Sequence, residues 1–440
     1  MSATFRSLSI PNYRIWFGGA LVSNVGTWMQ RVAQDWLVLS VLTAGSGVAV
    51  GITTGLQFLP MLLLGPYAGL VADRVDKRRL LMLTQGLSGL WGLVLGVLVV
   101  TGSAQLWHVY VLAALLGITT AFDAPARQTF VAALVPPENL PNAVGLNSAA
   151  FNGARLVGPG IAGLLIAAFG TGPVFLINAV TFMATVVALV LMRTDELRPM
   201  PLAARGKGQV REGLRYVKGR PEIVLVLVVM GTVGTLGMNF QLTTALVATG
   251  VFDKGAQEYG LLGSILAIGS LSGALLAARR ERPRLRLVLG AAGAFGVSAI
   301  VAASMPTYWS FAIALIPVGL TALTLMTAAN AMVQTTTEPA MRGRVMALYM
   351  MIFMGGTPIG SPLIGLVGDV FGARWTIYLG GISALVVTVG AVLYVLRRDD
   401  LRIRYRLHQT PHLQVLNAAE RSAAHASLDA ESARAGRTAA

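Results

Sequence analysis

The residues GLVADRVDKRRLL (69–81) decide the fold of this chain, because they form a short charged connection between two long apolar segments. A weaker copy, GALLAARRERPRL (273–285), follows after about 200 residues. A second pair of similar stretches has nearly the same spacing: LVGPGIAGLLIAAFG (156–170) and PIGSPLIGLVGDVFG (358–372). Repeats of this kind are typical of membrane proteins built from two related halves, with a binding site between the halves near the bilayer midplane. We therefore expect two homologous halves.

The composition predicts an integral membrane protein. Of the 440 residues, 55% are hydrophobic and 12% are charged, whereas soluble domains average about 25% charged residues. The net charge of +15 does not indicate nucleic-acid binding, because the Lys and Arg residues lie mostly in connections between apolar segments. The chain has no cysteine and four scattered histidines, so we expect neither a disulfide nor a metal site.

Apolar stretches long enough to cross a bilayer as a helix, about 20 residues, recur along the whole chain. Twelve are predicted, at 15–42, 47–72, 80–101, 107–134, 142–168, 173–193, 222–248, 258–278, 286–304, 308–334, 345–369 and 375–396. Basic residues gather in every second connection, and the positive-inside rule places such connections in the cytoplasm. We therefore expect a multi-pass protein of the inner (plasma) membrane with both termini in the cytoplasm.

The fold class that follows is an all-α membrane protein with twelve transmembrane helices in two pseudo-symmetric six-helix bundles. The N-terminal bundle is predicted at 1–193 and the C-terminal bundle at 222–396. Between them, 194–221 is expected to be a cytoplasmic linker, because basic residues crowd into it. The tail, 397–440, becomes rich in Ala, Ser and Arg, which predicts a largely disordered cytoplasmic segment.

The stretch GLVADRVDKRR resembles the signature loop of the major facilitator superfamily, Gly-x-Leu-Ala-Asp-Arg-x-Gly-Arg-Lys. The matching residues are Gly69, Asp73, Arg74, Lys77 and Arg78. Asp76 stands where the family usually has Gly. The resemblance implies that this loop latches the cytoplasmic side when the transporter faces outward. From the residue types, Asp73 can accept from backbone N–H groups at a helix N-terminus, and the two arginines can bridge to carboxylates or to helix C-terminal carbonyls.

Further motifs narrow the resemblance. GPGIAG (158–163) is similar to the Gly-Pro-x-x-Gly motif of the superfamily's antiporters, with Gly158, Pro159 and Gly163 at the matching positions. These residues permit close helix packing and a kink. The run from 122 to 163 and RGRVMALYM (342–350) resemble bacterial exporters of the enterobactin-exporter and macrolide-efflux type. One departure is that the first half of 107–134 has no Arg, although many proton antiporters of the superfamily carry one there.

Charged residues inside predicted helices are the first candidates for a functional site. In TWMQRVAQDWLVL (27–39), Arg31 and Asp35 lie within an apolar segment, where each charge costs roughly 2.5–3.5 kcal/mol at the bilayer centre. Helical spacing puts both on one polar face, four residues apart, so they can pair and can face a cavity. Asp123 and Arg127 repeat this spacing, and Arg155 lies just before the Gly-Pro motif.

Three interpretations of these charges remain open. Asp35, or next Asp123, can carry a proton as access alternates. Arg31 or Arg155 can bind an anionic substrate, or the charges can form static ion pairs that fix helix register. Arg127 is the expected partner of Asp123. Further residues expected to line a cavity, from their polar or aromatic side chains, are Asn24, Trp28, Gln34, Phe58, Phe151, Asn239, Asn330 and Gln334.

We therefore expect a proton-coupled exporter (an antiporter) of small organic compounds, such as drugs or siderophores, that works by alternating access. An importer or facilitator of a small nutrient is the alternative. A membrane sensor or membrane-embedded enzyme is less favoured, because the sequence contains no Ser-His-Asp or metal constellation. There is no nucleotide-binding motif either, so the proton gradient is the expected driving force, without ATP or a cofactor. The expected partners are the substrate, protons and the lipid bilayer, with the chain acting as a monomer.

Overall fold

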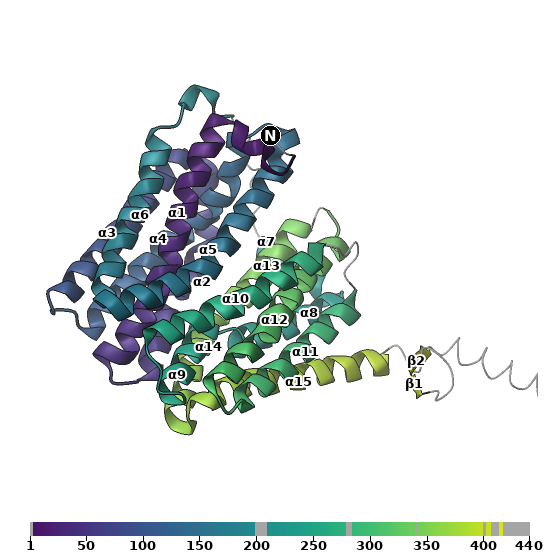
Figure 1. The fold of residues 1–440 in the computed structure, drawn as a ribbon. Coiled ribbons are helices and arrows are strands. Elements are labelled where there is room, and N and C mark those ends of the chain that lie inside the picture. The colour runs from purple at the N-terminus through teal and green to yellow at the C-terminus, as the bar shows by residue number, and fades with distance from the viewer. Residues whose placement is uncertain are drawn as a thin grey trace, which may run out of the picture. The chain divides into compact units, whose positions relative to one another are not determined.

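The computed structural model describes residues 3–198, 209–278, 284–339, 341–398, 402–405 and 413–416. The chain forms two compact units, Met1–Leu385 and Val386–Ala440. The first unit contains nearly all of the helices (Figure 1). The second holds the end of the last helix and two short strands, β1 (Arg402–Tyr405) and β2 (Leu413–Leu416), which pair antiparallel. Most of the predicted tail, 397–440, lies outside the described residues.

The N-terminal half consists of six long helices. They are α1 (Pro11–Trp36), which continues as the π-helical turn η2 (Leu37–Leu42), α2 (Gly47–Arg74), α3 (Lys77–Val100), α4 (Leu106–Leu134), α5 (Leu140–Phe169) and α6 (Thr171–Val190). Short 3-10 turns, η1 (Ala3–Ser9), η3 (Pro137–Asn139) and η4 (Thr194–Glu196), lie in the connections. The charged stretch 69–81 is the turn between α2 and α3, as expected from the sequence.

The C-terminal half has nine helices among the described residues. They are α7 (Gln209–Lys218), α8 (Pro221–Leu236), α9 (Phe240–Gly250), α10 (Ala256–Ala278), α11 (Leu285–Ser304), α12 (Tyr308–Thr336), α13 (Arg342–Gly355), α14 (Thr357–Phe371) and α15 (Ala373–Arg398). Helix α7 lies in the predicted linker, and part of that linker is outside the described residues. Each remaining predicted segment coincides with one helix or with a broken pair.

Membrane-length helices confirm the all-α membrane architecture. By length and composition, eleven helical stretches of the described chain can cross a bilayer, with α8–α9 and α13–α14 each counted as one. The twelfth predicted segment, 15–42, corresponds to α1 and η2. It falls outside the eleven, because charged and amide side chains lower its mean hydropathy. Its polar face is needed inside the N-terminal half, as described below.

Two predicted helices are broken in the middle, which the sequence pattern did not predict. The predicted segment 222–248 divides at Gly237–Asn239 into α8 and α9. The side chain of Asn239 compensates for part of the break, because its Nδ2 donates to the backbone oxygen of Thr235 over 2.8 Å. The predicted segment 345–369 divides at Gly356, two residues before Pro358, and Pro358 has no N–H to continue the hydrogen-bond ladder.

Small residues bring the two halves together at one end of the first unit, where α2 and α10 begin and α5 and α14 end. We call this the far end, and the end where α1 begins the N-terminal end. A Cβ at Gly51 would lie 2.3 Å from the backbone oxygen of Ser361, so α2 and α14 touch through their backbones. A Cβ at Gly260 would lie 2.3 Å from the backbone oxygen of Pro159, which joins α5 and α10 in the same way. Such contacts are the usual interface between membrane helices.

A carboxylate reinforces the α2–α14 contact. Asp369, near the end of α14, accepts from the backbone N–H of Gly47 over 2.6 Å and from that of Val48 over 3.0 Å. The hydroxyl of Ser46 also donates to it, over 3.3 Å. An anion at a helix N-terminus satisfies free N–H groups and interacts favourably with the helix dipole. Asp369 therefore caps α2 from the opposite half.

Candidate functional site

The larger cavity lies within the N-terminal half and has a volume of about 630 Å³. Its lining extends from Trp16, near the start of α1, to Arg31, in the last third of that helix. Asn24, which the sequence predicted to face a cavity, is part of the lining, together with Thr27 and Gln30. The polar face of α1 thus borders this space, which explains why a membrane helix carries so many amides.

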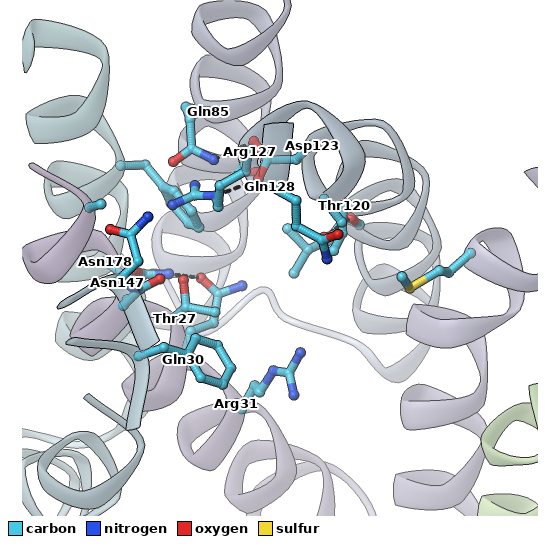
Figure 2. A pocket seen from close by; sticks show the side chains of 18 of the residues that line it. Thr27, Gln30, Arg31, Gln85, Thr120, Asp123, Arg127, Gln128, Asn147 and Asn178 are labelled. Carbon is cyan, nitrogen blue, oxygen red and sulfur yellow. Dashed lines mark hydrogen bonds and ion pairs between the residues drawn. The ribbon is translucent and has the colours of Figure 1, made fainter. Parts of the chain in front are cut away.

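Asp123 is the most extensively bonded charge in this cavity (Figure 2). Its Oδ1 accepts from Thr84 and from Gln85, each over 2.7 Å, and its Oδ2 accepts from the Nε of Arg127 over 2.9 Å. The predicted Asp123–Arg127 pair is therefore confirmed. The guanidinium of Arg127 also lies 5.5 Å from the ring of Trp16. Hydrogen bonds to a charged group are stronger than neutral ones, so three donors to one carboxylate make this group a structural anchor.

A second cavity, of about 370 Å³, lies between the halves near the middle of the helices. Trp28, Phe58, Phe151 and Arg155 line it from the N-terminal half. Asn239 lines it from the C-terminal half, at the break between α8 and α9. The sequence predicted all five of these residues for a cavity or a buried charge. Arg31, Phe58 and Phe151 border both cavities, so the two spaces are adjacent.

Arginine and aromatic side chains form the wall of the second cavity. The guanidinium carbon of Arg31 lies 5.1 Å from the centre of the Trp28 ring and 5.6 Å from that of Phe58. The guanidinium carbon of Arg155 lies 5.6 Å from the same Trp28 ring. Such cation–π contacts stabilise a cation by about 0.5–2 kcal/mol. The guanidinium groups of Arg31 and Arg155 therefore both contact the indole ring of Trp28.

Asp35 does not occupy the position predicted for it. Its exposed fraction is 6%, and it lines neither cavity. The predicted ion pair with Arg31 is wrong for this conformation, since no ion pair among the described residues joins them. Instead, the hydroxyl of Tyr259 donates to its Oδ2 over 3.2 Å. Tyr259 lies on α10 and lines the second cavity, so Asp35 is screened from that cavity by a residue of the other half.

Three more predicted cavity residues lie elsewhere. Gln34 is 2% exposed and lines neither cavity, because the polar face of α1 turns into the helix packing at this depth. Asn330 and Gln334 also lie outside both cavities, in the last turns of α12, and bond to each other over 2.5 Å. The spacing of Asn330 and Gln334 correctly predicted that they share one face of α12, but it did not predict what that face contacts.

The signature loop is held by contacts within its own half. Arg78 donates through Nε to the backbone oxygen of Leu189 over 2.6 Å, at the end of α6. This is the predicted bridge to helix C-terminal carbonyls. The cap of α3 is Asp76, whose Oδ1 accepts from the N–H of Arg79 over 2.7 Å. The prediction gave this kind of capping to Asp73; in this conformation the residue that departs from the family pattern supplies it. The latch role of Gly69, Asp73, Arg74 and Lys77 stays a prediction.

The Gly-Pro motif lies where α5 meets its neighbours. A Cβ at Gly158 would lie 2.6 Å from the Cβ of Trp28 on α1. A Cβ at Gly163 would lie 2.7 Å from the backbone oxygen of Ala256 on α10. Pro159 lies inside α5 and borders the second cavity. The motif therefore contacts both halves, while its role in antiport stays a prediction.

Sequence reasoning missed three residues of interest. Tyr259 and Gln241 line the second cavity, and Asp369 caps α2. Tyr259 carries no pattern that separates it from other helix aromatics. Asp369 had a usable signal, since it is an acid near a predicted membrane end, but such a residue is more often interfacial.

Comparison with known proteins points to one family. A family model described as "transmembrane secretion effector" matches residues 2–424. The chain is 26% identical to a staphyloferrin A transporter of Staphylococcus aureus, over 91% of this chain and 99% of that protein. It is 30% identical to the multidrug efflux pump Tap of Mycolicibacterium fortuitum, over 87% of this chain and 95% of Tap. It is 23% identical to macrolide efflux protein A of Streptococcus pyogenes, over 90% of this chain and 99% of that protein.

Solved structures share the fold. A bacterial homologue of the human lysosomal transporter Spinster, in an inward-facing and unoccupied conformation, gives a TM-score of 0.64 at 15% identity, over 87% of this chain and 95% of that one. A mutant of the nucleoside transporter NupG gives a TM-score of 0.64 at 12% identity, over 87% of this chain and 99% of NupG. At these identities the likeness concerns the fold alone.

Proposed function

Because the chain belongs to the transmembrane secretion effector family of the major facilitator superfamily, we propose that it exports small organic compounds, such as drugs or siderophores, in exchange for protons. The relatives named as a multidrug efflux pump and a macrolide efflux protein support the direction of transport, and the relative named as a staphyloferrin A transporter supports the breadth of substrates. The chain is a multi-pass membrane transporter and not an enzyme.

The observation that carries the proposal is the second cavity, which both halves enclose near the middle of the helices. Alternating access requires a site of this kind, because a substrate bound between two bundles changes sides when the bundles rock. The halves meet tightly at the far end, through Gly51 and Gly260. The larger cavity, by contrast, extends toward the N-terminal end. One end is thus sealed by packing while a polar cavity approaches the other.

The distribution of basic residues supports a cytoplasmic location for the N-terminal end. Under this orientation, in the plasma membrane, the structure corresponds to an inward-facing state, in which substrate enters the cavity from the cytoplasm. The far end is then the extracellular gate. Its opening would release the substrate outside.

We assign the coupling proton to Asp35 in preference to Asp123. Asp123 has three donors, including a paired arginine, and all of them come from the N-terminal half. Asp35 has one side-chain donor among the described residues, Tyr259, and this donor comes from the other half. Rocking of the halves changes the hydrogen bonding of Asp35 but leaves that of Asp123 intact. A carboxylate whose environment differs between the two states can bind a proton in one state and release it in the other.

Everted membrane vesicles test this function. Respiration acidifies their interior, so an antiporter of the proposed direction accumulates substrate inside, and an uncoupler abolishes the accumulation. A panel with a macrolide, ethidium and a hydroxamate siderophore covers the substrate range. Uptake into right-side-out vesicles instead would support an importer. Asp35→Asn is expected to abolish gradient-driven accumulation, while Asp123→Asn, if it folds, keeps its dependence on the gradient. Unchanged proton dependence in Asp35→Asn would reject the assignment.

A further inference from the structure

We propose that the second cavity selects organic anions: compounds with an apolar body and a carboxylate or similar oxyanion bound by Arg31 and Arg155. This inference rests on the proposed transport function and names the class of substrate that the same site would take. It contrasts with the other interpretations of these arginines, as partners of Asp35 or as static register pairs.

The guanidinium groups of Arg31 and Arg155 both contact the ring of Trp28, and neither forms an ion pair with a carboxylate of the described residues. Both guanidinium carbons are within 5.6 Å of the Trp28 ring centre. The ion pairs among the described residues include neither Arg31 nor Arg155. No Asp or Glu of the described chain lines this cavity. Asp35 acts on Arg31 through its charge without forming an ion pair with it, so both arginines of the described cavity wall are left without a directly bonded carboxylate.

The energy of this arrangement favours an anionic ligand. Like charges repel, and transferring each cation from water into the membrane interior is costly. Contact with Trp28 and Phe58 offsets part of that cost. A planar oxyanion bound by either guanidinium group would offset more, because arginine binds carboxylates through two parallel charge-assisted hydrogen bonds.

The opposite half contributes a further donor. Gln241, at the start of α9, lines the same cavity, and its Nε2 is buried without a hydrogen-bond partner. A buried donor left without an acceptor is costly, so a ligand with acceptor oxygens would satisfy this donor once the side chain turned into the cavity. This observation is independent of the arginines, because it concerns a different helix in the other half.

The remaining lining defines the rest of the ligand. Phe58, Phe151, Phe240 and Phe353 border the cavity, and methionines such as Met238 lie among them. Aromatic and methionine side chains adapt to varied apolar shapes. The site therefore combines a fixed anion-binding point with a permissive apolar pocket.

A matched pair of fluorescent probes tests the inference on the full-length protein in nanodiscs. Dansylglycine carries a carboxylate, and dansylglycinamide has the same body without the charge. We expect the wild type to bind the anion about tenfold more tightly, the effect of one charge-assisted hydrogen bond. Arg31→Gln and Arg155→Gln should each reduce this preference, and the double variant should abolish it. Arg31→Lys should retain part of it, because the charge remains.

The controls separate this inference from the proposed function. Arg193→Gln removes an exposed arginine that pairs with Glu196, and it should keep the preference of the wild type. A preference absent from the wild type, or one that persists in the double variant with an unchanged melting temperature, would overturn the inference. Binding at equilibrium needs no gradient. Anion preference without gradient-driven accumulation in vesicles would therefore contradict only the proposed exporter, and accumulation without anion preference would contradict only the substrate class.

Discussion

At the scale of single residues, the two buried carboxylates differ in what holds them. Asp123 is bonded by three side chains of its own half. Asp35 depends on Tyr259 from the other half. The ring of Tyr259 also stacks on Trp36, with centroids 6.3 Å apart, so its hydroxyl is held in place by packing. The hydroxyl of Tyr259 can therefore link proton binding by Asp35 to the movement of the halves.

Removing that hydroxyl should uncouple export from the gradient. Tyr259→Phe keeps the stacked ring and deletes the donor to Asp35, which costs about 1–3 kcal/mol for a buried acceptor. We expect gradient-driven accumulation in everted vesicles to fall roughly tenfold while protein yield is maintained. Tyr308→Phe is the matched control, because its hydroxyl donates to the backbone oxygen of Glu258 within the same half. Equal transport by the two variants would contradict the role of Tyr259.

At the scale of elements, the break between α8 and α9 forms part of the cavity wall. Asn239 stabilises it twice: its Nδ2 donates to the backbone oxygen of Thr235, and its Oδ1 accepts from the hydroxyl of Ser361 on α14. An interrupted membrane helix needs such side chains, because lipid offers no partners to freed backbone groups. The break therefore depends on one amide.

Asn239→Ala should destabilise the protein. The change leaves the backbone carbonyl of Thr235 short of a partner, at about 1–3 kcal/mol for a buried group, and removes the contact to Ser361, whose hydroxyl keeps its bond to the backbone oxygen of Thr357. We expect a lower melting temperature in detergent, measured by thermal unfolding. Asn152→Ala serves as the comparison, because the amide of Asn152 donates only to Ser148 of its own helix, in an exposed hydrogen bond. If both variants melt at the same temperature, the break does not depend on Asn239.

The sequence predicts features that depend on neighbouring residues, and it does not predict contacts between residues far apart in the chain. Hydropathy and the repeat predicted the membrane helices and the two halves, since both are local patterns along the chain. Spacing predicted the Asp123–Arg127 pair, because four residues bring side chains together on any helix. The bond from Tyr259 to Asp35 spans 224 residues. No local pattern predicts such a contact, and for that reason the sequence placed Asp35 in the cavity, where it could pair with Arg31.

At the scale of the whole transporter, the proposed gate at the far end combines packing with one charged cap. Gly51 and Gly260 permit backbone contact on the two seams. Asp369 adds hydrogen bonds to Ser46, Gly47 and Val48 on the α2–α14 seam. The cap can form only while the far end is closed. It therefore stabilises the closed far end against the open one.

Removing the charge of this cap should shift the conformational equilibrium. A lost helix cap of this kind costs about 0.5–2 kcal/mol, enough to change a ratio of states several-fold. We expect Asp369→Ala to increase the rate at which a maleimide labels a cysteine at Ser361, which is fully buried in the closed seam. The chain has no native cysteine, so the label reports this position alone. Asp253→Asn changes another acid in a connection at the same end and should leave the rate unchanged. An unaltered rate in Asp369→Ala would mean that the cap does not hold the gate.

The cap also breaks the symmetry of the duplicated halves. In the internal repeat, Asp369 of the later copy falls opposite Ala167 of the earlier copy, so the α5–α10 seam has no equivalent acid at that position. Of the two equivalent helix contacts, α2–α14 and α5–α10, only α2–α14 therefore has this carboxylate cap. The α5–α10 seam can part without releasing a helix end, whereas the α2–α14 seam must release one. We therefore expect the far end to open first between α5 and α10, with the α2–α14 contact acting as the hinge. Substrate would then leave from one side of the molecule and not along its pseudo-symmetry axis.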